Sequence, residues 1–491
     1  MNQIRNMKLM EKSHKWIILS VVLALIGKVS GYEGAVNPAV PLLYNGEYPQ
    51  FHQLTTNPAA LFTIQGDEFT LYKVSSFYQN NELIRTYDPG SMNEVDLLFD
   101  FSRNIDSKSF VNGGIRYTQT NKFDLFSSLE QDFYTNYFSL IDSTNGNVKY
   151  DGPQLWFQYN RKLLSHLILG INLEYGVERG LKNRGTKCES IIRNNISGAG
   201  LGFLSKTGNL FIGINGNYIN RQFSYESVGV YSSAEVYSFS GFQVYTSESP
   251  RRIVEKFEYN SGYEYGFQFW QRNLLNSGFG IGLVTRIFGR DANIKLGSTT
   301  RHQPVGYWVR EGLTNTFLLN FQPEKGYFSG RFIIENRTYQ DWAKAGGFPT
   351  IILENDNQQL RWGLATAITG LLNSKFYGSL DVTTTNIDYQ EYIEPFGIEE
   401  DLQTIQYKLG INTKIGLLSS VSFEYFTGNE DLDFHWDIDA VGYWGTGIRF
   451  ERQFLFGVLG FRSVIHNTVS DDSGSDNKSN QRLFFELFVR R

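Results

Sequence analysis

Residues 167–178 alternate between apolar and polar side chains at successive positions. Because successive side chains of a strand point to opposite faces, this run predicts a strand with one apolar and one polar face. The apolar face consists of Leu167, Leu169, Ile171, Leu173, Tyr175 and Val177, and the polar face includes Asn172, Glu174 and Glu178. A membrane-spanning β-barrel needs this arrangement, with the apolar side chains in lipid and the polar ones in the lumen.

Similar runs recur along the rest of the chain and predict about 18 strands, with 14–16 as the alternative count. The predicted strands are 69–79, 94–103, 109–119, 153–162, 166–179, 194–205, 210–223, 258–271, 279–288, 313–322, 327–338, 358–369, 375–386, 404–415, 419–428, 443–452, 454–465 and 481–490. The connections between them are alternately long and short. Bacterial outer-membrane barrels have short periplasmic turns and long extracellular loops, so the pattern predicts an all-β, antiparallel transmembrane barrel over residues 69–491.

A secreted β-sandwich or propeller also strings short strands together, and it is the alternative architecture. Those folds do not require alternation of long and short connections, and the sequence shows no blade repeat. Proline placement also favours the barrel: Pro153 is expected to begin a strand, and no proline is expected in a strand interior.

The N-terminus has the organisation of a cleaved signal peptide over residues 1–31, with a basic start, an apolar core at 16–27 and small residues before Tyr32. The apolar core is shorter than the roughly 20 residues that span a bilayer as a helix. Residues 32–68 follow as an irregular, proline-rich segment on the periplasmic side or in the lumen. We expect residues 32–61 to form a plug held by the Asn57 amide, Leu61 and Phe62, and a mobile periplasmic tail is the competing interpretation.

Composition narrows the class of protein further. Aromatic residues make up 15% of the chain and glycine 48 of its 491 residues, as expected of a barrel with aromatic girdles. The net charge of −5 and the lack of a basic block argue against a nucleic-acid partner. The single cysteine, Cys188, has no internal disulfide partner and is expected to be an exposed thiol.

The predicted inward faces carry charges of both signs. The candidate lumen-lining residues are Asp96, Asp100, Arg116, Lys162, Glu174, Glu178, Arg286, Arg331, Glu335, Arg337 and Arg449, and Lys408 and Lys414 extend the set. These charges either select solutes in a polar conduit or form paired charges that only solvate the interior. The mixed signs favour the second interpretation.

Signatures of enzymes and of metal or cofactor sites are weak. The chain has no nucleophile-elbow motif and no pair of histidines at zinc-protease spacing. The best local cluster is Phe434-His435-Trp436-Asp437-Ile438-Asp439, after Glu430, Asp431 and Asp433, and we interpret it as a solvated acidic loop. The sequence therefore predicts a protein that is not an enzyme, with no catalytic residues, no metal and no cofactor.

Two predicted extracellular loops, 120–152 and 224–257, are rich in aromatic residues: Phe123, Phe126, Phe133, Tyr134, Tyr137, Phe138, Phe239, Phe242 and Tyr245. Exposed apolar patches of this kind can bind a protein partner. Alternatively, the rings extend the strands above the membrane or fold into the lumen.

The segment Thr56-Asn57-Pro58-Ala59-Ala60-Leu61, just before the first predicted strand, resembles the Asn-Pro-Ala motif of the long-chain fatty-acid transporter superfamily of outer-membrane proteins. In that superfamily an N-terminal segment folds into the barrel as a hatch, so the resemblance implies a plug motif at Asn57, Pro58 and Ala59. The Tyr-, Asn- and Gly-rich strands also look like those of uncharacterised outer-membrane barrels of Bacteroidota.

These observations predict a passive or gated channel for small solutes in the Gram-negative outer membrane. The alternative is a barrel without transport activity that scaffolds an envelope assembly or secretion complex. The expected surroundings are outer-membrane lipid and lipopolysaccharide, and the expected partners are the barrel-assembly machinery during biogenesis and an envelope protein.

Overall fold

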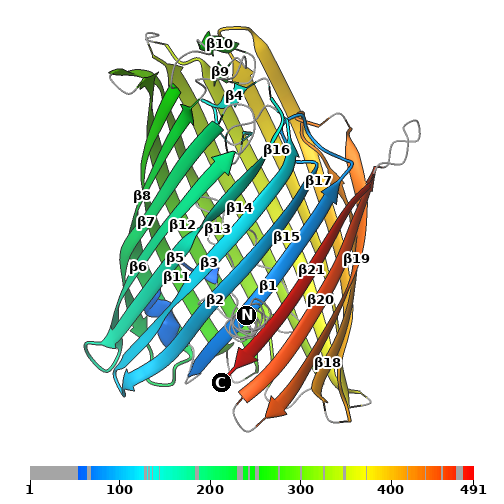
Figure 1. Cartoon of the computed structure of the whole chain (residues 1–491). Helices are drawn as coiled ribbons and strands as arrows, with labels where there is room; N and C mark the ends of the chain where they lie inside the picture. The colour runs from blue at the N-terminus through cyan, green and yellow to red at the C-terminus, as the bar shows by residue number, and fades with distance from the viewer. Residues whose placement is uncertain are drawn as a thin grey trace, which may run out of the picture.

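The computed structural model forms a closed barrel of 18 antiparallel strands, which confirms the predicted fold class and strand count (Figure 1). The structure describes residues 54–63, 68–126, 130, 133–134, 136–142, 144–182, 187–228, 236–241, 244–248, 254–274, 277–298, 301–323, 327–346, 350–371, 373–416, 418–436, 438–454, 457–470 and 479–491. The predicted signal peptide and most of the segment 32–68 therefore lie outside the described residues.

The barrel strands follow one another around the wall in chain order, and β1 closes the ring by pairing with β21. They are β1 (Phe69–Asn81), β2 (Ser91–Asp106), β3 (Ser109–Leu125), β5 (Gly146–Lys162), β6 (Leu167–Lys182), β7 (Lys187–Leu204), β8 (Leu210–Val228), β11 (Val254–Leu274), β12 (Phe279–Ser298), β13 (Arg301–Phe321), β14 (Phe328–Ala345), β15 (Leu353–Leu371), β16 (Ser374–Glu391), β17 (Phe396–Ile415), β18 (Leu418–Asp431), β19 (Ala440–Phe454), β20 (Gly457–Ser470) and β21 (Ser479–Arg490).

Three short strands lie outside the barrel wall. They are β4 (Leu140–Asp142), β9 (Val236–Ser240) and β10 (Val244–Glu248), and they form a small antiparallel sheet in the order β10-β9-β4. Figure 1 shows this sheet at the upper end of the barrel, opposite the C-terminus. A 3-10 helix, η2 (Pro58–Thr63), precedes β1. Among the described residues, no helix is long and apolar enough to cross a membrane.

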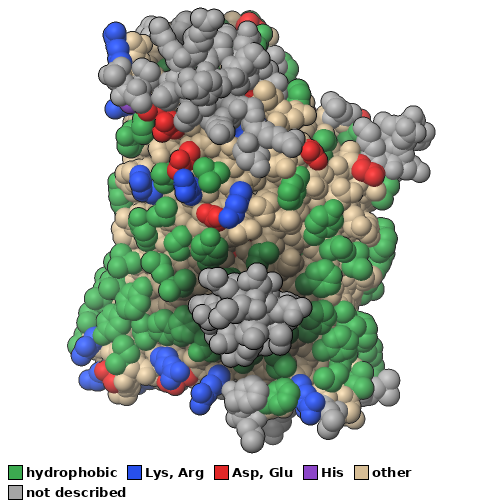
Figure 2. Space-filling model, in the orientation of Figure 1, with side chains coloured by type: hydrophobic (Ala, Val, Ile, Leu, Met, Phe, Trp, Pro, Cys, Tyr) green, Lys and Arg blue, Asp and Glu red, His purple; other side chains and the backbone are tan. Residues whose placement is uncertain are grey.

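The wall carries apolar side chains outward in the pattern predicted from residues 167–178. On β6 the outward Leu169, Ile171 and Leu173 are 36%, 39% and 52% exposed, whereas Ile168 on the opposite face is fully buried. In Figure 2 hydrophobic side chains gather over the lower part of the barrel, with charged side chains above them and at the lower rim. An apolar belt on the outside of a closed barrel is the surface of a membrane-spanning barrel.

The upper ends of the strands extend further than predicted. Residues 289–312 were expected to be a long loop, but β12 runs to Ser298 and β13 begins at Arg301. Side chains above the bilayer face water on the outside, so the apolar pattern stops while the hydrogen-bonded ladder continues. Most of the predicted loop 289–312 is therefore strand whose outward side chains are mostly polar.

The expectation for proline was also wrong. Pro153 lies inside β5, where the pairing with β6 lapses between Asp151 and Gln154, while its pairing with Tyr117 of β3 continues. Pro304 lies inside β13 beside a bulge at Ile294 and Lys295 of the neighbouring strand. Both prolines are tolerated because the ladder is already interrupted there.

Candidate functional site

The lumen face of the wall carries the charged residues that the sequence proposed as its lining. On β2 and β3, Arg116 donates through Nη2 to Asp96 Oδ2 at 2.6 Å and through Nε to Asp96 Oδ1 at 3.0 Å. Asp100 is 5% exposed on the same face. On β6, Glu174 accepts a hydrogen bond from Gln154 of β5 at 2.6 Å. Part of the lining is therefore paired.

The remaining candidates share the lumen face but are not all brought together. Lys162 lies with its ammonium 5.1 Å from the ring of Phe62. Arg449 pairs with Glu451 on β19. The other candidates occupy inward-facing positions of β6, β12 and β14, on the same face as buried side chains of those strands. They are Glu178, Arg286, Arg331, Glu335 and Arg337. Any role of these residues in selecting solutes belongs to the proposals below.

The upper mouth of the barrel is covered by the chain itself. We call the described residues between Glu130 and Asp142, which include β4, the lid. Its end at Asp142 is held by β6, because Lys182 Nζ donates to the two carboxylate oxygens of Asp142 at 2.8 and 3.1 Å. Both side chains are excluded from solvent, with exposures of 1% and 0%.

A second buried ion pair joins the start of the lid to β11. Lys256 Nζ donates to Glu130 Oε1 at 2.7 Å, and both side chains are 2% exposed. Lys256 also donates to the carbonyl oxygen of Phe138, and the same Glu130 oxygen accepts the backbone N–H of Leu140 at 2.7 Å. Burial raises the pKa of Glu130, and the charge of Lys256 opposes that rise.

A third attachment joins the lid to β13, β14 and β15. Tyr137 donates its hydroxyl proton to Asp341 Oδ2 at 2.7 Å, and Arg310 donates to both oxygens of Asp341 at 2.6 Å. Asn355 of β15 donates to the Tyr137 hydroxyl at 3.3 Å. Burial, reinforced by the Asp341 charge, raises the pKa of Tyr137 well above its ordinary value. Since β6, β11 and β14 lie at separate places around the wall, the lid crosses the mouth.

Aromatic rings pack within this cover. Phe133 contacts Tyr87, Tyr134 and Phe239, with ring centroids 4.1, 5.2 and 5.6 Å away. Phe133, Tyr137, Phe138 and Phe239 are all less than 10% exposed. These buried rings do not form an exposed patch, and they fit the other interpretation, in which the rings extend the strands or fold into the lumen. Exceptions are Phe126 and Tyr245, which are 48% and 59% exposed, and Phe242 lies outside the described residues.

The acidic loop at 430–439 is not simply solvated, which corrects the prediction from its sequence. The ring of His435 lies 4.0 Å from that of Phe434 and 4.9 Å from that of Tyr134 of the lid. The Arg85 guanidinium stacks on the ring of Tyr134, 3.9 Å from its centroid. Burial, helped by Arg85 and opposed by Asp433, lowers the pKa of His435 to about 4.

Cys188 is buried, which corrects the prediction of an exposed thiol. Its neighbours in sequence are polar, but it is the second residue of β7 and lies on the inward face. There it packs in a cluster with Leu140 of the lid and with Ile192, Phe223 and Tyr225 of the wall. The alternating pattern assigns a face only to residues within a predicted strand. The strand predicted here begins at residue 194, so it does not include Cys188.

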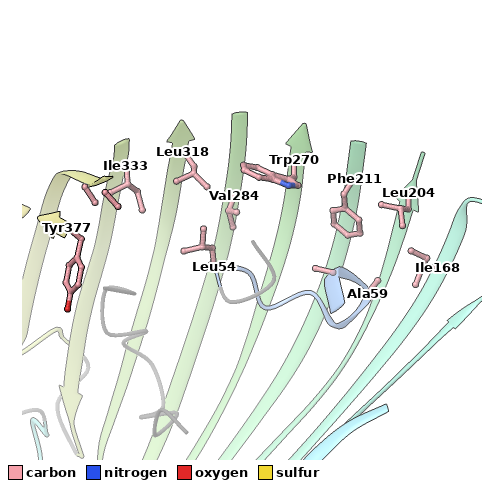
Figure 3. Packing of buried hydrophobic residues seen from close by; sticks show 13 residues of the cluster. Leu54, Ala59, Ile168, Leu204, Phe211, Trp270, Val284, Leu318, Ile333 and Tyr377 are labelled. Atoms are coloured by element: carbon pink, nitrogen blue, oxygen red, sulfur yellow. The ribbon is translucent and has the colours of Figure 1, made fainter. Parts of the chain in front are cut away.

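At the opposite end of the barrel, the Asn57-Pro58-Ala59 motif lies on the inner wall of β6, β7 and β8. Figure 3 shows Ala59 beside Ile168, Leu204 and Phe211 of these strands. Asn57 is 4% exposed and Ala59 is fully buried.

A chain of side-chain hydrogen bonds fixes the motif. Asn57 Nδ2 donates to Gln268 Oε1 at 2.8 Å, Gln268 Nε2 donates to Asn215 Oδ1 at 2.7 Å, and Asn215 Nδ2 donates to Thr56 Oγ1 at 3.2 Å. Asn57 Oδ1 accepts the N–H of Ala59 at 2.9 Å, which makes the local turn. The Asn57 amide therefore bonds to the wall, as expected from the sequence. Most of the predicted plug, residues 32–53, lies outside the described residues.

Glycines make room for the motif. A Cβ atom at Gly200 would lie 2.0 Å from Asn57 Oδ1, one at Gly213 2.5 Å from Asn57 Nδ2, and one at Gly170 2.5 Å from the backbone N of Ala59. These separations are far shorter than side-chain contacts allow. The glycines of β6, β7 and β8 are visible in the sequence, but only the structure shows that glycines from all three strands contact the same motif.

The described residues contain no group of three or more His, Cys, Asp or Glu side chains placed to hold a metal ion. Neither a protein-family model nor a curated protein matches the sequence significantly.

Solved outer-membrane proteins share the general architecture. The unliganded ferric citrate transporter FecA is 8% identical, with 86% of this chain and 79% of FecA covered and a TM-score of 0.42. The siderophore receptor PiuA from Acinetobacter baumannii is 7% identical, with 87% and 82% covered and a TM-score of 0.43. The copper transporter OprC is 6% identical, with 87% and 81% covered and a TM-score of 0.45. Likeness at this level carries no information on function.

Proposed function

We propose that the protein is a gated channel for small solutes in the outer membrane. The observation that carries the proposal is the lid, which crosses one mouth of a wide, charge-lined barrel and is held there by buried ion pairs. An 18-stranded barrel is wide enough for an aqueous passage unless something fills it. A cover made of loop rather than wall can move without breaking the barrel ladder.

The direction of the chain supports an extracellular lid. The C-terminus and the tight turns, such as the one between Asp106 and Ser109, lie at one end of the barrel, and the lid lies at the other (Figure 1). Periplasmic turns of outer-membrane barrels are short, and the longer connections are extracellular.

Reconstitution of the full mature chain into a planar bilayer tests the proposal. We expect a channel that is closed most of the time and that opens in discrete conductance steps. Absence of conductance, in the native protein and in variants whose lid is released, would contradict a channel.

The alternative, a scaffold for an envelope complex, loses most of the aromatic loop surface on which it was based, and Phe126 and Tyr245 remain exposed. Phe133, Tyr137 and Phe138 pack inside the mouth instead of facing a partner. The channel is therefore the function that this geometry supports better.

The N-terminal motif is proposed to restrain the periplasmic end of the passage. We expect Gly200→Ala to displace Asn57, because the new methyl group would lie 2.0 Å from its side-chain oxygen. Proteolysis of residues before β1 in the folded barrel should accelerate several-fold, and permeability to large antibiotics should rise. Gly176→Ala is the matched control, since a Cβ atom at that lumen-facing glycine meets nothing closer than 3.7 Å. Equal proteolysis of the two variants would contradict a docked motif.

Acidification is expected to loosen the contact between His435 and the lid. The pKa of His435 is about 4 in the closed arrangement, against about 6.5 when solvated, so the released loop binds a proton more readily. The contribution of His435 to closure is complete above pH 6.5, declines as the pH falls, and levels off near pH 4. Channel opening measured between pH 7 and pH 4 should rise over this window.

His435→Asn is the control, because it removes the titrating group. Burial of Glu130 acts in the opposite sense, since its raised pKa favours the closed state in acid. The contribution of His435 is therefore the difference between the native and His435→Asn profiles, and identical profiles would show that it has none.

A further inference from the structure

One quarter of the lumen wall is strongly basic. The inward positions of β12, β13, β14 and β15 carry two acidic side chains, Glu335 and Asp341, and the arginines Arg286, Arg290, Arg310, Arg331, Arg337 and Arg361. Inward residues on these strands are recognised by alternation with Val284, Thr316 and Ile333, all of which are less than 5% exposed. The excess of positive charge is local, because the whole chain has a net charge of −5.

Arg310 and Arg361 have carboxylate partners. Arg310 donates to both oxygens of Asp341 at 2.6 Å, and Arg361 Nε donates to Asp381 Oδ1 of β16 at 2.8 Å. The acid Glu335 accepts a hydrogen bond from the Thr316 hydroxyl at 3.0 Å. Asp341 is therefore paired with Arg310, whereas Glu335 has a neutral partner and its charge also acts on Arg337.

Arg286 differs from the other arginines. It is 9% exposed, and its Nε is buried without a hydrogen-bond partner, as are Nε of Arg290 and of Arg331; what sets Arg286 apart is the rest of its guanidinium. Among the residues that the structure describes, none forms a hydrogen bond or ion pair with its guanidinium. A buried cation without a counter-charge is costly, so this position favours the arrival of an anion.

Arg337 lies at the same level, two strands away. Thr314 of β13 pairs with Arg286 on one side and with Arg337 on the other. Neighbouring strands are about 4.8 Å apart, so the two arginine backbones are separated by roughly 10 Å, and both long side chains can reach one ligand between them. The Arg337 guanidinium lies 5.1 Å from the ring centroid of Tyr339 and 5.7 Å from that of Phe288, which holds it along the wall.

We propose that Arg286 and Arg337 form a binding site for a small solute that carries an oxyanion, either a carboxylate or a phosphate. Guanidinium groups match the geometry of both anions through paired hydrogen bonds. The site deepens the proposed channel function, on which its biological role rests, by making anions the preferred solutes. Arg331, lower on the same strand as Arg337, and Arg310, above it, extend the basic wall toward the two mouths.

Equilibrium binding tests the site independently of conduction. Inorganic phosphate and succinate are titrated separately into the detergent-solubilised full chain, and binding heat is measured for the native protein, Arg286→Gln and Arg337→Gln. We expect at least one anion to bind, and each variant to bind it roughly ten- to a hundredfold more weakly, as expected for the loss of hydrogen bonds to a charged group. Phosphate alone, succinate alone or both would assign the anion class, and binding of neither would overturn the site.

Arg449→Gln is the matched control. It removes one lumen arginine and the same charge, but Arg449 is paired with Glu451 and lies outside the basic wall. Anion binding should persist in this variant, and an equal loss would show a general charge effect and contradict the site. Arg286→Gln should also fold with unchanged or higher thermal stability, because it removes a buried charge without leaving a partner behind.

Conduction separates the two proposals. In a potassium chloride gradient the native channel should favour chloride over potassium, and Arg286→Gln should move the permeability ratio toward unity. Anion binding without conductance would support the site and overturn the channel. Conductance without anion binding would support the channel and overturn the site.

Discussion

Ile171→Arg is expected to remove most of the folded barrel from the membrane. Ile171 points outward near the middle of the apolar part of β6 and is 39% exposed there. An arginine facing lipid at the bilayer midplane costs roughly 2–4 kcal/mol, a large share of the stability of a typical domain. The heat-modifiable, folded band in outer-membrane extracts measures this loss.

Asn172→Arg is the control at the next position of the same strand. Asn172 faces the lumen, where a new guanidinium meets polar side chains and the carboxylate of Glu174 on the same face of β6. Its effect on the folded fraction should be much smaller, although nearby Asn217 must adjust. Equal losses from the two variants would show that the strand has the same environment on both faces, which a barrel strand does not.

The fold was accessible from the sequence because the bilayer imposes a simple pattern. Every strand must satisfy its backbone within the wall and present apolar side chains to lipid, so alternation marks each crossing. The same reasoning explains why the upper strand ends were missed. Above the bilayer, outward residues such as Glu311 face water, and polarity no longer distinguishes strand from loop.

The candidate site was accessible only in part. Alternation assigned the lumen side chains to their face, including Arg286 and Arg337, but it gave no information on which charges would meet across strands. The lid was not predicted, because its contacts join residues such as Glu130 and Lys256 that are 126 positions apart. A lysine on an inward face near a strand end, as at Lys182 and Lys256, is the one local signal of a buried acidic partner.

Lys256→Met is expected to release the lid and increase the conductance of the channel. The substitution leaves Glu130 buried without its counter-charge, a change that typically costs about 3–5 kcal/mol. β11 stays paired with β8 and β12 along its length. We therefore expect the loss of the ion pair to open the lid rather than to unfold the barrel. Open probability in planar bilayers, and proteolysis within the lid, should both rise strongly.

The double variant Lys256→Met with Glu130→Gln identifies the cause. Removing the orphaned charge should restore much of the closure, because a neutral amide is cheaper to bury than a carboxylate and still accepts the Leu140 N–H. Lys149→Met is a surface control, since its ion pair with Asp151 is half-exposed and contributes little. A folded Lys256→Met barrel with native conductance and an intact, protected lid would contradict a gate held by this ion pair.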